Sequence, residues 1–362
     1  MSEIRTVTGP IHPDELGFTL MHEHILVDAS VYRPILEPTI PEKYRGLWDA
    51  PLTMDKLALL HKMPILLREN VALDDEEHMA GELADYRETG GAAILDVTAA
   101  GLRVDVQGVK RLSERTGVHI VTSTGFYIEP SWPDHVRDWT VDQFAHHMIG
   151  EIQDGIEGTD VRAGHIKVGI TDLSERQERV LVAAARAAQE TGASVTVHPG
   201  FTLGCDGRWI ADILIRAGLP PERLIIAHTE SHLVPGAMRD LIFTPDLPLV
   251  SLDFHRALLD RGVNISLDTF GSLWDVESMG ILLCPDWLRV RALVQLLEEG
   301  YGGQIVLGHD VFMKIMTRAY GGNGYSHLAR HVIPQLRELG VGDYEIRRMT
   351  VTNPARLLTL HT

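Results

Sequence analysis

Short apolar runs alternate with longer amphipathic stretches along most of this sequence, and that alternation limits the folds open to the chain. Eight apolar runs have a length that suits a buried strand. The predicted strands are Leu20–Leu26, Ala92–Val97, His119–Thr124, Ile166–Ile170, Val195–His198, Leu224–His228, Val263–Leu267 and Ile305–Gly308. The predicted helices are Leu73–Thr89, Gln107–Thr116, Thr140–Gly155, Leu173–Thr191, Trp209–Ala217, Ser251–Asp260, Asp286–Glu299, Tyr325–Leu339 and Asn353–Leu360. Such alternation implies parallel strands with right-handed crossovers, and eight strands favour closure into a barrel.

The expected fold class is therefore α/β, a (β/α)8 TIM barrel that forms one domain over residues 1–362. Turn signals such as Gly9-Pro10 predict a short N-terminal β arm within residues 1–17. Residues 28–51 are rich in proline and aromatic side chains and have no clean period, so we expect a long ordered loop there. No glycine-rich dinucleotide fingerprint follows the first strand, which disfavours a doubly wound nucleotide-binding sheet.

The charge balance narrows the possible partners. Fifty acidic against 33 basic residues give a formal net charge of −17, which would repel nucleic acid and anionic membranes. No apolar run approaches the length of a membrane span, and the N-terminus lacks the apolar core of a signal peptide. The only two cysteines, Cys205 and Cys284, are expected to be free thiols in a reducing compartment. We expect a cytoplasmic protein that acts on a small molecule.

Two histidines stand two residues apart in the first predicted strand. Because successive side chains of a strand point to opposite faces, His22 and His24 share one face and Glu23 lies on the other. Neutral imidazoles bind zinc and its neighbours well, so the pair could grip a metal ion. Two unrelated histidines near a strand end are an equally good reading of this motif taken alone.

Further potential ligands occur at the carboxyl ends of other predicted strands, where the chemistry of a barrel is located. The complete set is His22, His24, Lys167, His198, His228 and Asp310. A single histidine at a strand end is most often a hydrogen-bonded core or rim residue. Ligand types at five of the eight strand ends favour a metal centre instead.

These positions carry a specific family resemblance. The segments are Thr19-Leu-Met-His22-Glu-His24, Arg162-Ala-Gly-His-Ile-Lys167-Val, Val197-His198, Ala227-His228-Thr and Leu307-Gly-His-Asp310. Because these segments occur in the order found in that family, the sequence resembles the phosphotriesterase family of the amidohydrolase superfamily over nearly its whole length. The resemblance implies a barrel that holds two divalent metal ions, with zinc as the favoured metal. It assigns His22, His24 and Asp310 to the more buried ion, His198 and His228 to the more exposed one, and Lys167 to both.

Lys167 fits that assignment only in a modified form. A lysine ammonium has no lone pair and would repel a cation, whereas a neutral lysine that captures carbon dioxide becomes a carbamate with two oxygen ligands. An internal salt bridge from Lys167 to Asp310 or Asp96 is the alternative, and it would bury charge at a considerable desolvation cost. By resemblance, a hydroxide that bridges the two metals attacks the substrate, and Asp310 accepts its proton.

The substrate is indicated by fewer positions. Tyr127 matches a family position that is tyrosine in the lactonase-like branch, although a tyrosine packed on the rim is an equal reading. Thr269 stands where acyl-homoserine lactonases carry arginine, which puts those lactones in doubt. Phe312 lies in a segment, 311–324, that is expected to be a mobile loop over the pocket. Lys314, Arg318 and Arg208 are expected in loops near the mouth and could bind a substrate anion, but such charges are more often solvated surface groups.

Three functions remain open from the sequence. The preferred one is a binuclear metal-dependent hydrolase of a lactone or carboxylic ester. The first alternative is an aryl dialkyl phosphotriester hydrolase with the same machinery, and the second is a non-catalytic metal-binding barrel. The resemblance also implies a homodimer, formed through the aromatic segment between Tyr32 and Trp48.

Overall fold

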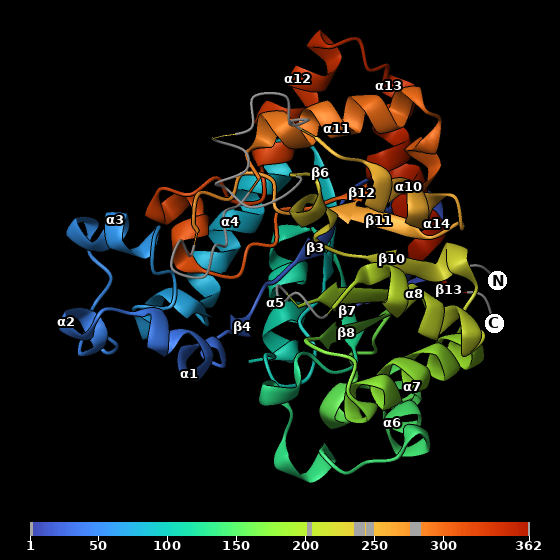
Figure 1. Ribbon diagram of the computed structural model, residues 1–362, viewed down its shortest axis with the longest axis horizontal. Helices are drawn as coiled ribbons and strands as arrows, with labels where there is room; N and C mark the ends of the chain where they lie inside the picture. The colour runs from blue at the N-terminus through green and yellow to red at the C-terminus, as the bar shows by residue number, and fades with distance from the viewer. Residues whose placement is uncertain (1–2, 201–204, 235–242, 244–249, 276–283, 361–362) are drawn as a thin grey trace.

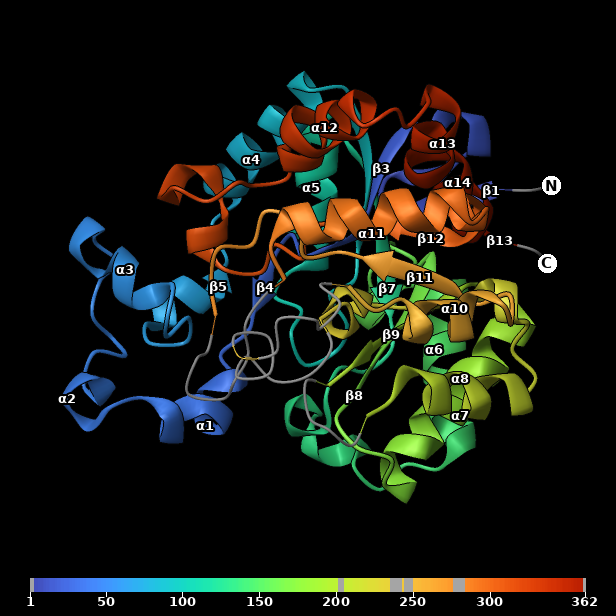
Figure 2. The ribbon, with the colours of Figure 1, turned by 45° about the horizontal axis from the view of Figure 1, so that its top comes forward.

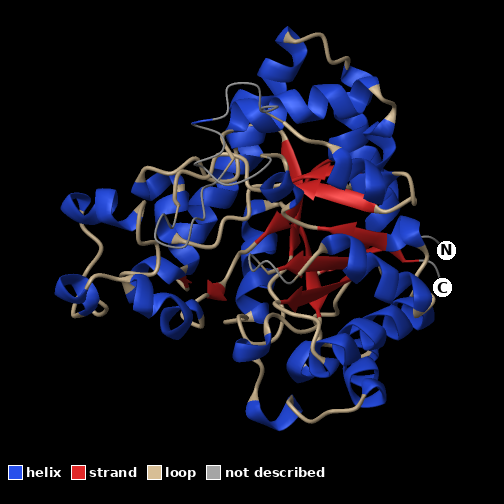
Figure 3. Ribbon diagram, viewed as in Figure 1, coloured by secondary structure: helices blue, strands red, loops and turns tan. Residues whose placement is uncertain are grey.

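The computed structural model describes residues 3–200, 205–234, 243, 250–275 and 284–360, and an eight-stranded parallel sheet forms its centre. In spatial order the strands are β12 (Ile305–Leu307), β11 (Asn264–Leu267), β10 (Leu224–Ile226), β9 (Val195–Pro199), β8 (His165–Ile170), β7 (His119–Thr124), β6 (Gly91–Asp96) and β3 (Phe18–Glu23). Strands lie inside and helices surround them, as Figure 3 shows. The predicted (β/α)8 barrel is confirmed as a sheet that is nearly closed.

Helices cover the outside of the sheet, and Figure 2 shows α6, α7 and α8 beside β8 and β9, with α4, α5 and α12 on another side. The longer helices are α4 (Glu76–Glu88), α5 (Val106–Thr116), α6 (Val141–Gln153), α7 (Glu175–Thr191), α8 (Gly207–Arg216), α10 (Asp253–Leu259) and α11 (Asp286–Glu298). Local sequence signals set their ends. Thr140 and Gln143 form a capping box at the start of α6, and Gly192 ends α7 in a left-handed conformation.

The strands bury both of their faces, which explains their apolar runs. In β8, Ile166, Val168 and Ile170 belong to the main apolar cluster of the protein. The alternate side chains instead contact polar groups: His165 contacts Ser194 and Thr196 at β9, and Lys167 contacts His22 of β3. The period of two therefore directs Lys167 away from the layer of helices.

The N-terminal arm is present and also involves the end of the chain. Strands β1 (Glu3–Thr6) and β2 (Gly9–Ile11) form an antiparallel hairpin, and β1 pairs on its other edge with β13 (Thr359–Leu360). The predicted last helix therefore ends early, because α14 covers only Asn353–Leu358. Before it lie α12 (Ile333–Glu338) and α13 (Asp343–Arg347). The first part of the helix predicted over Tyr325–Leu339 contains a π-helical turn, Leu328–Val332, that leads into α12.

The prediction of a loop over residues 28–51 was wrong. This part of the chain contains α1 (Tyr32–Leu36) and α2 (Glu42–Arg45), and α3 (Leu57–Leu60) follows. Helices this short show no 3.6-residue period, which is why the sequence pattern missed them. An antiparallel pair, β4 (Val27–Asp28) with β5 (Ala72–Leu73), closes the base of the segment. Figure 1 shows α1, α2 and α3 extending to the left of the barrel.

Two glycines let strands and loops approach closely beside the strand ends. A Cβ atom at Gly125, where φ is +112°, would lie 2.1 Å from the carbonyl oxygen of Lys167. A Cβ atom at Gly308 would lie 2.9 Å from the carbonyl oxygen of His22. Glycine therefore allows β12 to meet β3 where the barrel closes. None of the helices in the described ranges is long and apolar enough to span a membrane.

Candidate metal centre

The structure brings the predicted ligands together although they come from five different strand ends. Ligand atoms of His22, His228 and Asp310 all lie within 4.8 Å of one another. His24 Nε2 lies 3.2 Å from Asp310 Oδ1, and Lys167 Nζ lies 3.0 Å from His22 Nε2. His198 joins the group through Nδ1, which is 2.7 Å from His228 Nε2. The six side chains form one buried cluster.

Asp268 sets the protonation of two of these histidines. Its Oδ1 lies 2.7 Å from His228 Nδ1 and its Oδ2 lies 2.8 Å from His22 Nδ1. A carboxylate can only accept, so His228 donates from Nδ1, and the short contact with Asp268 favours a proton on Nδ1 of His22 as well. Nε2 of each ring then faces the cluster, next to Lys167 Nζ for His22 and next to His198 Nδ1 for His228.

Thr98 does the same for the third histidine. Its hydroxyl donates to Asp96 Oδ1 at 2.5 Å, so it accepts from His24 Nδ1 at 2.8 Å. The free lone pair of His24 Nε2 then faces the carboxylate of Asp310. A ring nitrogen lone pair and a carboxylate that face each other, as His24 Nε2 and Asp310 do, repel unless a cation lies between them, so this donor set fits a metal ion.

Burial and neighbouring charges shift the pKa values of groups in this cluster. Burial lowers the pKa of Lys167 to about 8, which makes its neutral amine accessible near neutral pH. Burial, assisted by the charge of Lys167, lowers the pKa of His22 to about 4, so its ring is neutral. Burial alone would raise the pKa of Asp310, but the surrounding histidines, His22 foremost, hold it well below the ordinary value. Neutral imidazole and ionised carboxylate are the forms that bind metal.

The cluster opens into an apolar pocket. Its described lining is His24, Val27, Ala29, Tyr32, Ile35, Leu36, Pro64, Ile65, Leu102, Tyr127, Ile128, Thr171, His198, Gly200, Thr269, Trp274, Asp310, Phe312 and Met313. All three predicted substrate positions, Tyr127, Thr269 and Phe312, are therefore in the wall. The described lining contains no lysine or arginine, and Asp310 is its only acidic residue.

The hydroxyl groups in the wall are already partnered. The Tyr127 hydroxyl contacts that of Tyr32 and lies 3.3 Å from His198 Nε2. The Thr269 hydroxyl donates to Glu230 at 2.5 Å and accepts from Arg289 at 2.6 Å. Arg289 thus stands behind Thr269 instead of reaching the pocket.

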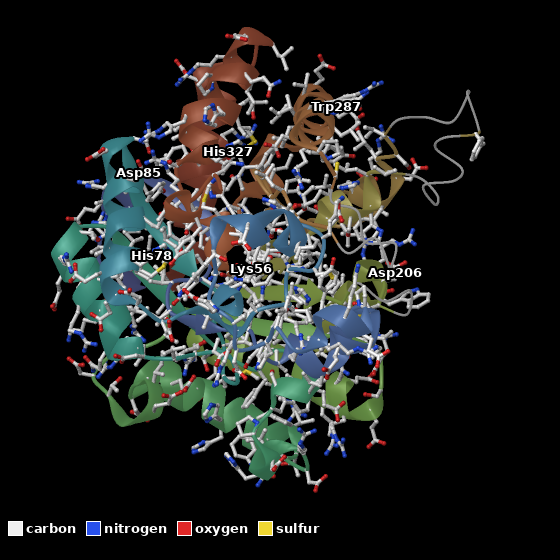
Figure 4. The ribbon with its side chains drawn as sticks, turned by 90° about the vertical axis from the view of Figure 1, so that its left-hand side faces the viewer. Lys56, His78, Asp85, Asp206, Trp287 and His327 are labelled. Atoms are coloured by element: carbon white, nitrogen blue, oxygen red, sulfur yellow. The ribbon has the colours of Figure 1, made fainter. Side chains whose placement is uncertain are left out.

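The basic residues considered as substrate ligands lie elsewhere. Arg318 pairs with Asp85, and Arg208 pairs with Asp206. Figure 4 labels both acids, Asp85 in α4 at the left of the view and Asp206 at the right. Lys314 lies 3.4 Å from Glu69. Phe312 does reach the pocket, while the segment behind it is held by a hydrogen bond from the Ile315 amide to Asn70.

Sequence reasoning did not identify the side chains that orient the ligands. Asp268 follows its strand as a single acid, and nothing nearby in the sequence indicates that it contacts histidines from two other strands. Tyr32 lies in the segment that was predicted to be a loop, so its contact with Tyr127 was also missed. Glu23 was placed correctly on the face opposite its two histidines, but no role followed from that.

Comparison with known proteins gives a consistent result. The phosphotriesterase family model matches residues 2–358. The N-acetyltaurine hydrolase of Salmo salar is 30% identical over 99% of this chain and 98% of its own length, and that of Homo sapiens is 30% identical over the same shares. A resiniferatoxin-binding protein from Rhodobacter sphaeroides superposes with a TM-score of 0.85 at 30% identity, covering 98% of this chain and 94% of that one. These matches show that the chain is a hydrolase that belongs to the phosphotriesterase family.

Proposed function

We propose that this protein is a binuclear metal-dependent hydrolase of apolar lactones or carboxylic esters. One divalent ion would be held by His22, His24 and Asp310 and a second by His198 and His228, with zinc as the favoured metal. The observation that carries the proposal is the convergence of the buried ring nitrogens of His22, His24 and His228 on Asp310. Nitrogen and oxygen donors in this number suit zinc.

Lys167 would bridge the two ions as a carbamate. It is 1% exposed, and its Nζ lies among the proposed ligands. The neutral amine adds to carbon dioxide and loses one proton, which gives an anion with two oxygen donors. A buried ammonium beside two metal ions would instead be repelled by both.

Different residues of the chain would have different roles in hydrolysis. When bound, the two metal ions would supply a hydroxide at neutral pH and polarise the scissile carbonyl group. Asp310 would accept the proton of the attacking group, because its carboxylate is ionised and borders the pocket. Phe312 and Trp274 contact each other edge to face, with ring centres 5.9 Å apart, and would limit the access of water from this side of the pocket.

The chemistry of the pocket favours an apolar substrate. An N-acetyltaurine hydrolase, as its name states, acts on a substrate that carries a sulfonate, which a binding site would pair with a cation or several N–H donors. The described wall offers no lysine or arginine for that purpose. Aliphatic and aromatic side chains instead suit the alkyl or aryl part of a lactone or ester. The aryl dialkyl phosphotriester stays as the second candidate, because its groups are also apolar.

Matched substrates separate these candidates. 4-Nitrophenyl acetate and diethyl 4-nitrophenyl phosphate share a leaving group, and N-acetyltaurine shares the acetyl group of the first. With protein of measured zinc content, we expect kcat/KM for the acetate ester to exceed the values for the other two by at least about tenfold, which is about 1.4 kcal/mol. Chelator-treated protein is the control. Faster turnover of the phosphate would favour the phosphotriester, and faster turnover of N-acetyltaurine would replace the proposed substrate class by a sulfonated amide.

The non-catalytic alternative receives no support. Structural zinc sites are closed tetrahedra and usually include thiolates. Cys205 and Cys284 are buried, and neither is in the described lining of the pocket. The family match, together with relatives that are named hydrolases, favours catalysis.

Single-domain organisation over residues 1–362 and a homodimer complete the proposal. The segment from Tyr32 to Trp48 keeps Tyr44 and Trp48 only half-buried, and Ile35 is 40% exposed. Contiguous apolar patches mark interaction sites, so we place the dimer interface on this segment. Sedimentation velocity at micromolar concentration is expected to give a dimer, and a monomer alone would contradict the proposed interface.

A further inference from the structure

Glu23 is the last residue of β3 and stands between His22 and His24, but it points to the opposite face, where it is fully buried. Both of its carboxylate oxygens accept N–H groups from the segment that follows β12. Oε1 accepts from the main-chain nitrogen of His309 at 2.7 Å and from His309 Nδ1 at 2.8 Å. Oε2 accepts from the main-chain nitrogen of Val311 at 3.1 Å. Three donors and no acceptor surround the group, which suits a carboxylate.

The two amides held by Glu23 flank Asp310, whose backbone is left-handed with φ at +53°. The amide of Asp310 itself donates to the carbonyl oxygen of His22 at 3.0 Å. Three consecutive amides of one segment are therefore tied to two consecutive residues of another. A non-glycine residue in this conformation is strained and persists only when its surroundings hold it.

The contact lies at the seam of the barrel. Strands β12 and β3 are the two edges of the eight-stranded order, so the position of Asp310 relative to His22 depends on how these edges meet. His309 extends the connection, because its Nε2 accepts the main-chain N–H of Leu328 at 3.0 Å. Both nitrogens of the His309 ring are thus used, one as donor to Glu23 and one as acceptor. This ring is neutral and structural, and it does not point to the metal centre.

We propose that Glu23 is a positioning residue for the metal centre: it holds the left-handed turn that aims the Asp310 carboxylate at His22 and His24. It acts through Asp310 and touches neither substrate nor metal. The inference rests on the proposed function, since it treats Asp310 as a ligand. Its physical content is that the hydrogen bonds of one buried side chain replace regular strand pairing at the place where the ligands of the first and last strands must meet.

Glu23→Gln tests this with almost no change in shape. If the amide oxygen accepts from His309, the new NH2 group faces the Val311 amide, and two donors oppose each other. The matched control is Glu82→Gln. Glu82 is also buried and also accepts two main-chain N–H groups of the segment after β12, those of Arg318 and Ala319 at 3.0 Å each. Those amides belong to residues eight and nine positions after Asp310. The control therefore removes the same kind of buried hydrogen bond without disturbing Asp310.

The measurements are zinc retained after dialysis against a chelator, thermal unfolding, and kcat and KM with 4-nitrophenyl acetate. For Glu23→Gln we expect a fall of about 10- to 100-fold in zinc affinity and in kcat, with little change in KM. Glu82→Gln should lose similar thermal stability but keep zinc and kcat. Retention of zinc and kcat by Glu23→Gln would overturn the inference, as would equal losses in the two variants.

A second variant covers the case in which Glu23→Gln does not fold. Glu23→Asp keeps the charge but is one methylene shorter, so it cannot reach both flanking amides, and the same pattern of loss is expected. Unchanged zinc affinity in Glu23→Asp would also overturn the inference. If the wild-type chain itself binds no zinc, the proposed metal centre fails and the inference fails with it. Normal zinc binding in the wild type, with no effect of either substitution, contradicts the role of Glu23 alone.

Discussion

Lys167→Met is expected to fold, to retain little zinc and to hydrolyse 4-nitrophenyl acetate at least about a thousandfold more slowly than the wild type, a loss of about 4 kcal/mol in transition-state stabilisation. Methionine fills nearly the same volume in the barrel but cannot form a carbamate. Lys167 is fully buried and lies 3.0 Å from a proposed ligand of the first ion, so its removal takes the shared anionic ligand from both ions. The remaining histidines and Asp310 would hold at most one ion weakly.

The modification itself can be observed directly. Wild-type protein incubated with zinc and ¹³C-bicarbonate should show a carbamate carbon signal that Lys167→Met lacks. Lys314→Met is the control, because Lys314 pairs with Glu69 outside the cluster. The carbamate proposal is wrong if Lys167→Met keeps its zinc and its full activity. It is also wrong if the wild type binds zinc and hydrolyses the ester without any carbamate signal.

The parts of this site that sequence predicts are those set by local periodicity. Alternation along a strand places His22 and His24 on one face, and parallel strands bring their carboxyl ends to one edge. These two rules were enough to predict that Lys167, His198 and His228 lie in one cluster. They require only the residue type and its position in its own strand.

The parts that sequence reasoning missed depend on contacts between elements. Asp268 is important because it lies between histidines of β3 and β10, and Glu23 because it meets the amides after β12. Neither contact has a spacing that a single strand reveals. The same holds for Tyr32, whose short helix α1 has too few turns to show a helical period.

Asp268→Asn is expected to weaken zinc binding by about 10- to 100-fold and to lower kcat/KM by at least as much. Asp268 is fully buried, and its two oxygens face the Nδ1 atoms of His22 and His228. An asparagine has one oxygen and one NH2 group, so one of the two rings must meet a donor. That ring then carries its proton on Nε2, and its lone pair no longer points to the metal centre.

The control and the zinc dependence distinguish this effect from a general loss of stability. Asp286→Asn also removes a carboxylate that pairs with a histidine, His327 at 2.6 Å, but this histidine is outside the cluster. We expect that variant to keep wild-type zinc affinity. Excess zinc should restore much of the kcat of Asp268→Asn, because the altered ring lowers affinity without removing the other ligands. If Asp268→Asn binds zinc as tightly as the wild type, Asp268 does not set the histidine tautomers, and the convergence of lone pairs loses its physical basis.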